Sequence, residues 1–333
     1  MGMSDTTDRA LGALTGLAVG DALGMPTQSL PRELIVRRYG DIVGGFHAAP
    51  PDHPLAAGLK AGSITDDTEQ ALLLARLLIE NNGRIDPAEL GRRLLSWEND
   101  MRARGSLDLL GPSTRSAISN LLAGQDPTET GRNGTTNGAA MRITPVGITV
   151  DVSDLGRLVQ RVVAASSFSH NTGVALAGAA AVAAAVSAGI DGATVAEAVE
   201  LAVAAARMAR HRGYWVAGGD VAARIEWAIE FVRDSDPAQL IQRIDQVVGT
   251  SLASQESVPA AFAVFAVHAD NPWLACRIAA SVGGDTDTIA AMVGAMSGAV
   301  YGSTAFPGAA VHLVTTVNHL LLTPMATALL ALR

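Results

Sequence analysis

The sequence predicts an all-α protein folded as a single compact multi-helix bundle. Apolar residues recur at helical spacing along most of the 333 residues, whereas the alternation of apolar and polar residues that marks a half-buried strand is scarce. Glycine and proline separate the helical segments, for example at Asp126-Pro127 and Asn133-Gly134. A doubly wound fold would need strands that alternate with helices, and the sequence has no such pattern.

The expected helices begin near the N-terminus. The segment 8–23 carries apolar residues at Leu11, Leu14 and Ala18, which is helical spacing. The segment 68–80 consists of strong helix formers. The same pattern returns in 87–99, 113–122, 153–166, 195–210, 219–233, 237–248 and 258–267.

Two further stretches, 172–190 and 288–317, contain no charged residue. Their length would permit transmembrane helices. Both consist mostly of Ala, Gly, Ser, Thr and Val, no Trp or Tyr belts flank them, and Pro307 interrupts the second. We therefore predict buried helices with small side chains. Gly294, Gly298 and Gly302 recur at every fourth residue, a spacing that predicts close helix packing.

Composition excludes several classes of protein. With 49% hydrophobic and 17% charged residues, the chain is too apolar to be disordered. The formal net charge of -8 argues against a nucleic-acid partner, which would require a basic surface. The single cysteine, Cys276, excludes an internal disulfide and a cysteine-rich zinc site. Residues 1–9 lack a basic region followed by an apolar stretch, so we predict a cytoplasmic protein without a membrane partner.

Two short acidic turns each precede a helical segment. The first contains Asp66 and Asp67 within 63–68, and the second contains Asp285 and Asp287 within 283–288. One interpretation of each turn alone is helix capping, because Asp and Thr satisfy free backbone N–H groups and suit the helix dipole. The other is chemical, because the Gly-Gly step before Asp285 allows an irregular turn in which both carboxylates converge.

If the two turns meet in space, four carboxylates share one small volume. Like charges at that distance raise one another's pKa strongly unless a cation neutralises them. Oxygen ligands from carboxylates and threonine hydroxyls suit hard cations such as Mg²⁺ or Mn²⁺. Two such cations could orient a water molecule and substrate hydroxyls.

Three other polar segments stand out. The glycine-rich segment 131–142 could hold phosphate oxygens with its backbone N–H groups, or it could be an ordinary surface turn. His170 precedes an alanine-rich helix and is either structural or catalytic. Asp21 lies in an apolar helix with glycines at regular spacing, so we predict that it is hydrogen-bonded and braces a neighbouring loop.

These segments, in this order, resemble the ADP-ribosylglycohydrolase family, which includes the dinitrogenase-reductase-activating glycohydrolases. The similarity runs through 16–24, 65–68, 137–147, 169–170 and 283–288 and so spans most of the chain. It implies one ADP-ribosylglycohydrolase-like domain over 1–333, with the orthogonal multi-helix bundle of that family. It also implies a centre of two Mg²⁺ (or Mn²⁺) ions and hydrolysis of the N- or O-glycosidic bond between ADP-ribose and an arginine, serine or small-molecule acceptor.

The resemblance also implies roles for individual residues. The implied metal ligands are Thr65, Asp66, Asp67, Asp285, Asp287 and Thr288. Of these, Asp66, Asp67 and Asp285 would also be catalytic, by orienting the attacking water. The implied substrate contacts are Gln28, Gly134, Thr135, Thr136, Asn137, Gly138 and His170. Gln28 stands where many relatives have a glutamate, and its neutral amide cannot act as a base.

Two alternative functions remain open from the sequence. One is a non-catalytic protein of the same fold that binds ADP-ribose or a nucleotide, which the neutral Gln28 weakly favours. The other is a hydrolase that acts on a small riboside instead of a modified protein. The complete set of six implied metal ligands favours an enzyme over a binding protein.

Overall fold

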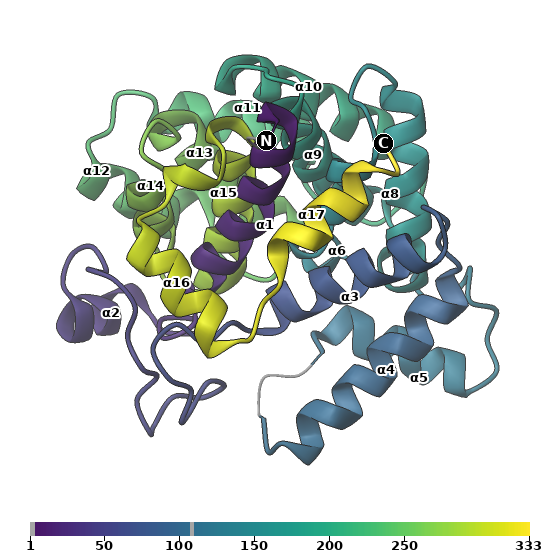
Figure 1. The fold of residues 1–333 in the computed structure, drawn as a ribbon, viewed down its shortest axis with the longest axis horizontal. Coiled ribbons are helices and arrows are strands. Elements are labelled where there is room, and N and C mark those ends of the chain that lie inside the picture. The colour runs from purple at the N-terminus through teal and green to yellow at the C-terminus, as the bar shows by residue number, and fades with distance from the viewer. Residues whose placement is uncertain (1–3, 107–109) are drawn as a thin grey trace.

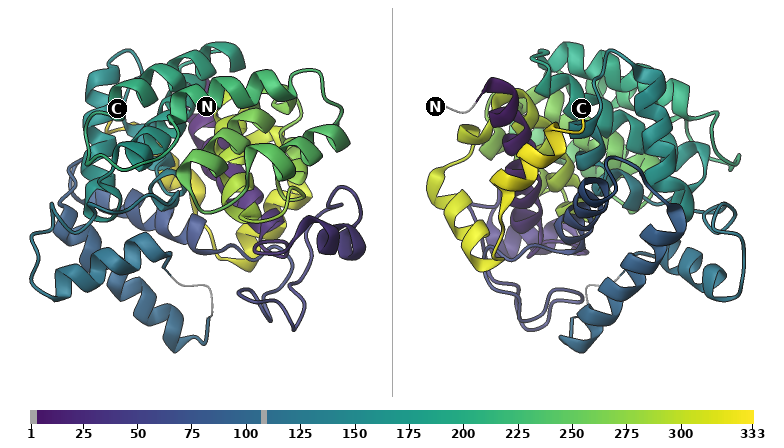
Figure 2. Two further views of the ribbon diagram at one scale, coloured as in Figure 1. Left: turned by 180° about the vertical axis from the view of Figure 1, so that it is seen from behind. Right: turned by 45° about the vertical axis from the view of Figure 1, so that its right-hand side comes forward.

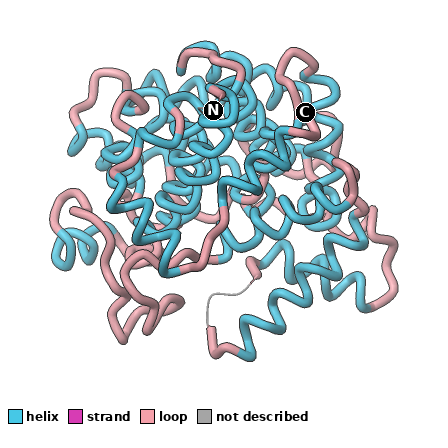
Figure 3. The backbone as a smooth tube through the Cα atoms, in the orientation of Figure 1, coloured by secondary structure: helices cyan, strands magenta, loops and turns pink. Residues whose placement is uncertain are grey.

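The computed structural model describes residues 4–106 and 110–333, and these residues form helices joined by loops (Figures 1 and 3). Within them the extended pairing is limited to three isolated bridges, and no β-strand occurs. The predicted all-α fold is therefore confirmed. The α-helices are α1 Asp5–Gly24, α2 Arg32–Tyr39, α3 Asp66–Glu80, α4 Pro87–Ala103, α5 Pro112–Leu122, α6 Gly138–Met141, α7 Thr144–Thr149, α8 Leu155–His170, α9 Gly173–Ile190, α10 Val195–Ala209, α11 Val221–Val232, α12 Pro237–Arg243, α13 Ser254–His268, α14 Pro272–Ala279, α15 Thr286–Tyr301, α16 Gly308–Val317 and α17 Leu322–Leu330.

Helices α1 and α15 cross the centre of the molecule in close antiparallel contact (Figure 1). A Cβ atom added to Gly16 would lie 2.0 Å from the carbonyl oxygen of Gly294, and one added to Gly12 would lie 2.2 Å from that of Gly298. Only glycine allows the two backbones to approach so closely. The packing predicted from the glycine spacing is thereby confirmed, and it places the last turn of α1 beside the first turn of α15.

Helix α9 passes through the interior, and nearly all of its residues are buried. It is long and apolar enough to cross a membrane, with a mean hydropathy of 2.0, yet 89% of it lies inside the protein. The predicted buried helix of small side chains is therefore confirmed for 172–190. The second uncharged stretch is broken as expected, because α15 ends at Tyr301 and α16 begins after Pro307.

The sequence pattern did not reveal five short helices, α2, α6, α7, α14 and α17. Each has four to nine residues, which is too few for a helical period to repeat clearly. The predicted segment 237–248 is also helical, although its second half, Ile244–Val248, is a π-helical turn. Helices α4 and α5 project from the main body of the bundle (Figures 1 and 2).

Candidate functional site

The two acidic turns meet. The Oγ1 atom of Thr288, in the first turn of α15, donates a hydrogen bond of 3.2 Å to Oδ2 of Asp67, in the first turn of α3. These residues are 221 positions apart in the chain. The antiparallel contact of α1 with α15 brings the second turn to this point, and α1 also holds the first turn, through Asp21.

Both turns border a cavity of about 400 Å³. The first turn contributes Asp66, and the second contributes Asp285, Asp287 and Thr288. Another part of the lining comes from α6 and the loop before it, and a further part comes from the segment after α1. The lining residues from these two segments are Gln28, Ser29, Thr136, Asn137, Gly138 and Met141. A small molecule of several functional groups fits a cavity of this size and mixed polarity.

Asp21 fixes the start of α3. Its carboxylate, completely buried in α1, accepts hydrogen bonds from the backbone N–H and the hydroxyl of both Thr65 and Thr68, at 2.5 to 3.1 Å. The predicted bracing role of Asp21 is confirmed. Burial raises the pKa of Asp21 to about 6, although the four donors oppose the shift. Because Thr65 is engaged in this way, its side chain does not reach the cavity wall.

Glycines shape the second turn. Gly283 and Gly284 have φ angles of 89° and 71°, in the left-handed region that favours glycine. A Cβ atom on Gly284 would also lie 2.5 Å from the carbonyl oxygen of Thr250. The carboxylate of Asp285 does not cap α15; instead its Oδ2 accepts a hydrogen bond from Nδ2 of Asn137 at 2.5 Å. Capping therefore does not account for this carboxylate.

The carboxylates of the site are held in an environment that disfavours their charge. Burial, together with the charges of Asp287 and Asp66, raises the pKa of Asp67 well above its usual value. Burial raises the pKa of Asp285 to about 6, against the stabilising hydrogen bond from Asn137. The Oδ1 atom of Asp67 is buried and has no hydrogen-bond partner. This group of oxygen atoms suits a hard divalent cation, which would relieve both the repulsion and the missing contact.

The site is not a preformed ligand cage. Among residues 4–106 and 110–333, no three His, Cys, Asp or Glu side chains lie close enough together to form a ready metal site. Binding of a cation by both turns would therefore require small movements of the carboxylates toward one another. Thr288 and the four aspartates are the residues positioned to take part.

The glycine-rich loop lies against the end of α8. A Cβ atom on Gly134 would lie 2.0 Å from the carbonyl oxygen of Ser169, so this glycine is needed for close packing. Of the substrate contacts implied for the loop, Thr136, Asn137 and Gly138 line the cavity, whereas Gly134 and Thr135 do not.

His170 is not among the residues that line the cavity, and its implied contact with the substrate stays a prediction. Its side chain is completely buried, and both ring nitrogens are hydrogen-bonded, Nδ1 with Ser169 and Nε2 with Thr136. It therefore reaches the cavity only through Thr136. Sequence analysis missed Arg115 and Thr250, which line the cavity from α5 and from the loop before α13. No motif marks either residue.

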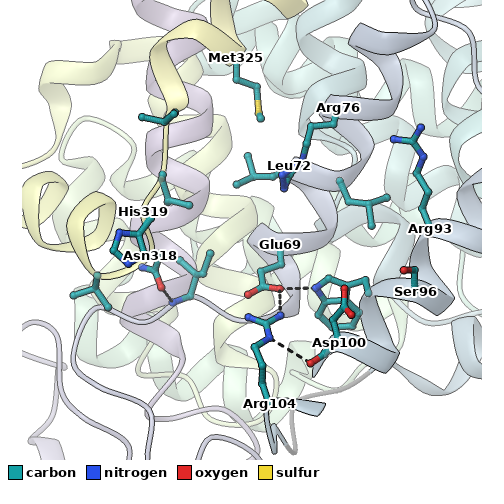
Figure 4. Close-up of a pocket in the computed structure, with 16 residues that line it drawn as sticks. Glu69, Leu72, Arg76, Arg93, Ser96, Asp100, Arg104, Asn318, His319 and Met325 are labelled. Atoms are coloured by element: carbon teal, nitrogen blue, oxygen red, sulfur yellow. Dashed lines mark hydrogen bonds and ion pairs between the residues drawn. The ribbon is translucent and has the colours of Figure 1, made fainter. Parts of the chain in front are cut away.

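A second cavity of about 900 Å³ lies between α3, α4 and the turn from α16 to α17 (Figure 4). Two of its charged residues, Glu69 and Arg104, pair with each other, and Arg93 pairs with residues outside the lining. Glu69 accepts a hydrogen bond from Trp97 and lies 3.4 Å from Arg104, and Arg93 forms an ion pair of 2.6 Å with Glu80. None of the residues that the sequence assigned to the site lines this cavity, so it is distinct from the acidic one.

Comparison with known proteins shows which proteins this chain is similar to. The family model described as ADP-ribosylglycohydrolase matches residues 3–333. The chain is 37% identical to the uncharacterized protein YegU of Escherichia coli over 324 residues, which is 97% of this chain and 96% of the relative. It is 29% identical to the ADP-ribosylarginine hydrolase Tri1 of Pseudomonas putida, covering 94% of this chain and 76% of that one.

The fold is also similar to a solved structure. The chain in a structure titled ADP-ribosylglycohydrolase-related protein complex superposes with a TM-score of 0.67 at 26% sequence identity. The superposition covers 99% of both chains. The likeness thus extends to every helix that forms the acidic cavity.

Proposed function

This chain belongs to the ADP-ribosylglycohydrolase family, and on that premise we propose that it is a metal-dependent hydrolase that releases ADP-ribose from an ADP-ribosylated acceptor. Family membership supports the broad class, a hydrolase acting on ADP-ribosyl compounds. The observation that carries the finer proposal is the hydrogen bond from Thr288 to Asp67, which joins the two acidic turns at one cavity.

The chemistry follows from the carboxylates around the cavity. Hydrolysis breaks the bond between the anomeric carbon of the ribose and the acceptor nitrogen or oxygen, and water supplies the new hydroxyl group. The transition state carries positive charge on the ribose ring, as in other glycoside cleavages. Asp66, Asp67 and Asp285 would stabilise that charge and accept hydrogen bonds from the attacking water. Two divalent cations, when bound, would orient the ribose hydroxyls and lower the pKa of the water.

The remaining wall would hold the substrate. The amide nitrogen of Gln28 is buried and has no hydrogen-bond partner, so it is available to donate to a substrate oxygen. Thr136 and Gly138 offer a hydroxyl and a closely approachable backbone beside the carboxylates. This wall suits the hydroxyl-rich ribose and diphosphate of ADP-ribose.

The function is tested with defined substrates. The purified protein is incubated with ADP-ribosyl-arginine and ADP-ribosyl-serine peptides and with small ribosides, first with Mg²⁺ and then with EDTA, and the products are measured by mass spectrometry. We expect free ADP-ribose from at least one ADP-ribosylated substrate, and none in EDTA. Binding of ADP-ribose without turnover of any substrate would support the non-catalytic alternative. Release of ribose from ribosides alone would support a hydrolase that acts on small ribosides.

Metal binding should stabilise the fold more strongly at higher pH. At about pH 5 the metal-free site retains protons, because the pKa of Asp285 is raised to about 6 and that of Asp67 is also raised, and a cation must displace them. At about pH 7.5 Asp285 is ionised, so this cost is smaller. We expect the rise in melting temperature on adding Mg²⁺ or Mn²⁺ to be several degrees at the higher pH and much smaller at the lower.

Calorimetry with and without metal measures the rise in melting temperature at each pH. Comparing samples with and without metal at the same pH removes the contribution of groups that metal binding does not affect. An equal shift at both pH values, or a larger shift at the lower one, would contradict the assignment of these carboxylates as ligands.

A further inference from the structure

We infer that Arg142 is a positioning residue that holds two sides of the acidic cavity at once: Asp66 through Gln70, and Thr136 through Ser169 and His170. The inference rests on the proposed function for the chemical role of the cavity, and its evidence is a hydrogen-bonded network among buried side chains.

The surroundings of Arg142 are unusual for a cation. It follows α6 directly and is 0% exposed. Among the described residues its Nε atom has no hydrogen-bond partner. Burial lowers the pKa of Arg142 to about 10, and the charge of Asp66 opposes that shift. An apolar side chain would avoid the desolvation cost, so the guanidinium has another use at this position.

The first branch runs to the acidic turn. Nη1 of Arg142 donates to Oε1 of Gln70 at 3.2 Å, and Nε2 of Gln70 donates to Oδ2 of Asp66 at 2.7 Å. The guanidinium has only donors and the carboxylate only acceptors, so the orientation of the Gln70 amide between them is determined. Arg142 thus fixes the amide, and the amide fixes one oxygen of a carboxylate that lines the cavity.

The second branch runs to Thr136, which also lines the cavity. Nη2 of Arg142 donates to Oγ of Ser169 at 2.6 Å, and that oxygen lies 2.7 Å from Nδ1 of His170. The Nε2 atom of His170 lies 3.0 Å from Oγ1 of Thr136, which in turn donates to Ser113 at 2.8 Å.

Every hydrogen in this second branch has one consistent direction. Because the Thr136 hydroxyl gives its one hydrogen to Ser113, its oxygen accepts from Nε2 of His170, and the Ser169 hydroxyl directs its own hydrogen to the other ring nitrogen, Nδ1. His170 is neutral, since burial and the nearby Arg142 charge lower its pKa well below the usual value. Its remaining hydrogen is therefore on Nε2 and points to Thr136. The network assigns a single tautomer to a histidine that does not touch the cavity.

The two branches end at two residues that line the same cavity, Asp66 and Thr136. Gly138 leaves room for the network, because a Cβ atom there would lie 3.0 Å from Cε1 of His170 and 3.8 Å from Nη1 of Arg142. A planar guanidinium with several fixed donors can serve both branches at once, and a lysine ammonium cannot do so with the same geometry. Arg142 therefore sets the relative placement of the metal-binding and substrate-binding sides.

The test separates the branches by variant. Gln70→Leu interrupts only the first branch, Ser169→Ala only the second, and Arg142→Met both; Arg76→Met, at an exposed arginine of the second cavity, is the control. Mn²⁺ affinity is measured by titration calorimetry, and kcat and KM are measured with the substrate found above. We expect Gln70→Leu to weaken Mn²⁺ binding by about 10- to 100-fold, as for other residues that orient a metal ligand. We expect Ser169→Ala to raise KM and leave Mn²⁺ affinity unchanged. Arg142→Met should both weaken Mn²⁺ binding and raise KM.

A spectroscopic measurement tests the network independently of metal binding and enzymatic activity. Nitrogen NMR of the wild-type His170 ring should show the neutral tautomer with its hydrogen on Nε2, and Ser169→Ala should alter the Nδ1 signal. A charged ring, or a hydrogen on Nδ1, would overturn the network even if the enzyme is active.

Wild-type metal affinity and KM in both branch variants would overturn the positioning role. Absence of Mn²⁺ binding and turnover in the wild type, with the expected tautomer present, would instead refute the proposed function. If Arg142→Met does not fold, Gln70→Leu and Ser169→Ala still test the positioning role.

Discussion

Replacing Asp285 with asparagine is expected to abolish release of ADP-ribose and to remove most of the affinity for divalent metal. Asn137 holds the carboxylate of Asp285 toward the cavity by a hydrogen bond, and Asp285 is the N-cap residue of α15, in an irregular conformation that no helix-capping bond explains. Asparagine keeps the shape and removes the charge. We expect kcat to fall by about 10³-fold or more, the size seen when one directly acting group is lost.

The matched control is Asp270→Asn, which removes a carboxylate from an exposed turn. It should leave turnover and metal affinity unchanged. Rates are measured as ADP-ribose released at saturating Mg²⁺, and the fold of each variant is checked by circular dichroism. Near-normal turnover of Asp285→Asn with Mg²⁺ present would show that this carboxylate has no part in the reaction.

Replacing Gly16 with alanine should strongly destabilise the protein. Alanine normally stabilises a helix relative to glycine by about 1 kcal/mol. In α1, however, the added Cβ atom would lie 2.0 Å from the carbonyl oxygen of Gly294 and 2.8 Å from the ring of Phe306. Backbone atoms of α15 cannot move aside without separating the two central helices. We expect the free energy of unfolding to fall by at least about 3 kcal/mol, or the protein to fail to fold.

Gly308→Ala gives the opposite case, because a Cβ atom at this first residue of α16 meets nothing within 4 Å. Its stability should be equal to the wild type or slightly higher. Thermal unfolding followed by circular dichroism compares the two variants. If Gly16→Ala proved as stable as Gly308→Ala, the close crossing that joins the two acidic turns would not exist as described.

The sequence indicated the parts of the fold that depend on repeated local patterns. Helical spacing indicated the long helices, and glycines at every fourth residue indicated the crossing of α1 and α15. The short helices α2, α6, α7, α14 and α17 escaped because four to nine residues give too few repeats for a period to be recognised. Pro307 marked the region of the break between α15 and α16, although α15 already ends at Tyr301, before Gly302 with its φ of 82°, and Pro307 is the N-cap residue of α16.

The candidate site could be predicted only in part. Asp66, Asp67, Asp285 and Asp287 could be identified because two pairs of carboxylates, each just before a helical segment, are conspicuous in a largely apolar chain. The network around Arg142 could not, because its partners lie 27 and 72 residues away in the chain. The burial of His170 also depends on packing between the loop and α8, which no local pattern reveals.

The central claim is that both acidic turns bind the same cations, and a double-mutant cycle on metal affinity tests it most directly. Mn²⁺ is titrated calorimetrically into the chelator-treated wild type, Asp67→Asn, Asp285→Asn and the double variant. For a shared site, each single substitution should remove most of the binding, and the double variant should lose little more than either. Independent, additive losses, or full Mn²⁺ binding in either single variant, would mean that the two turns do not share a metal site.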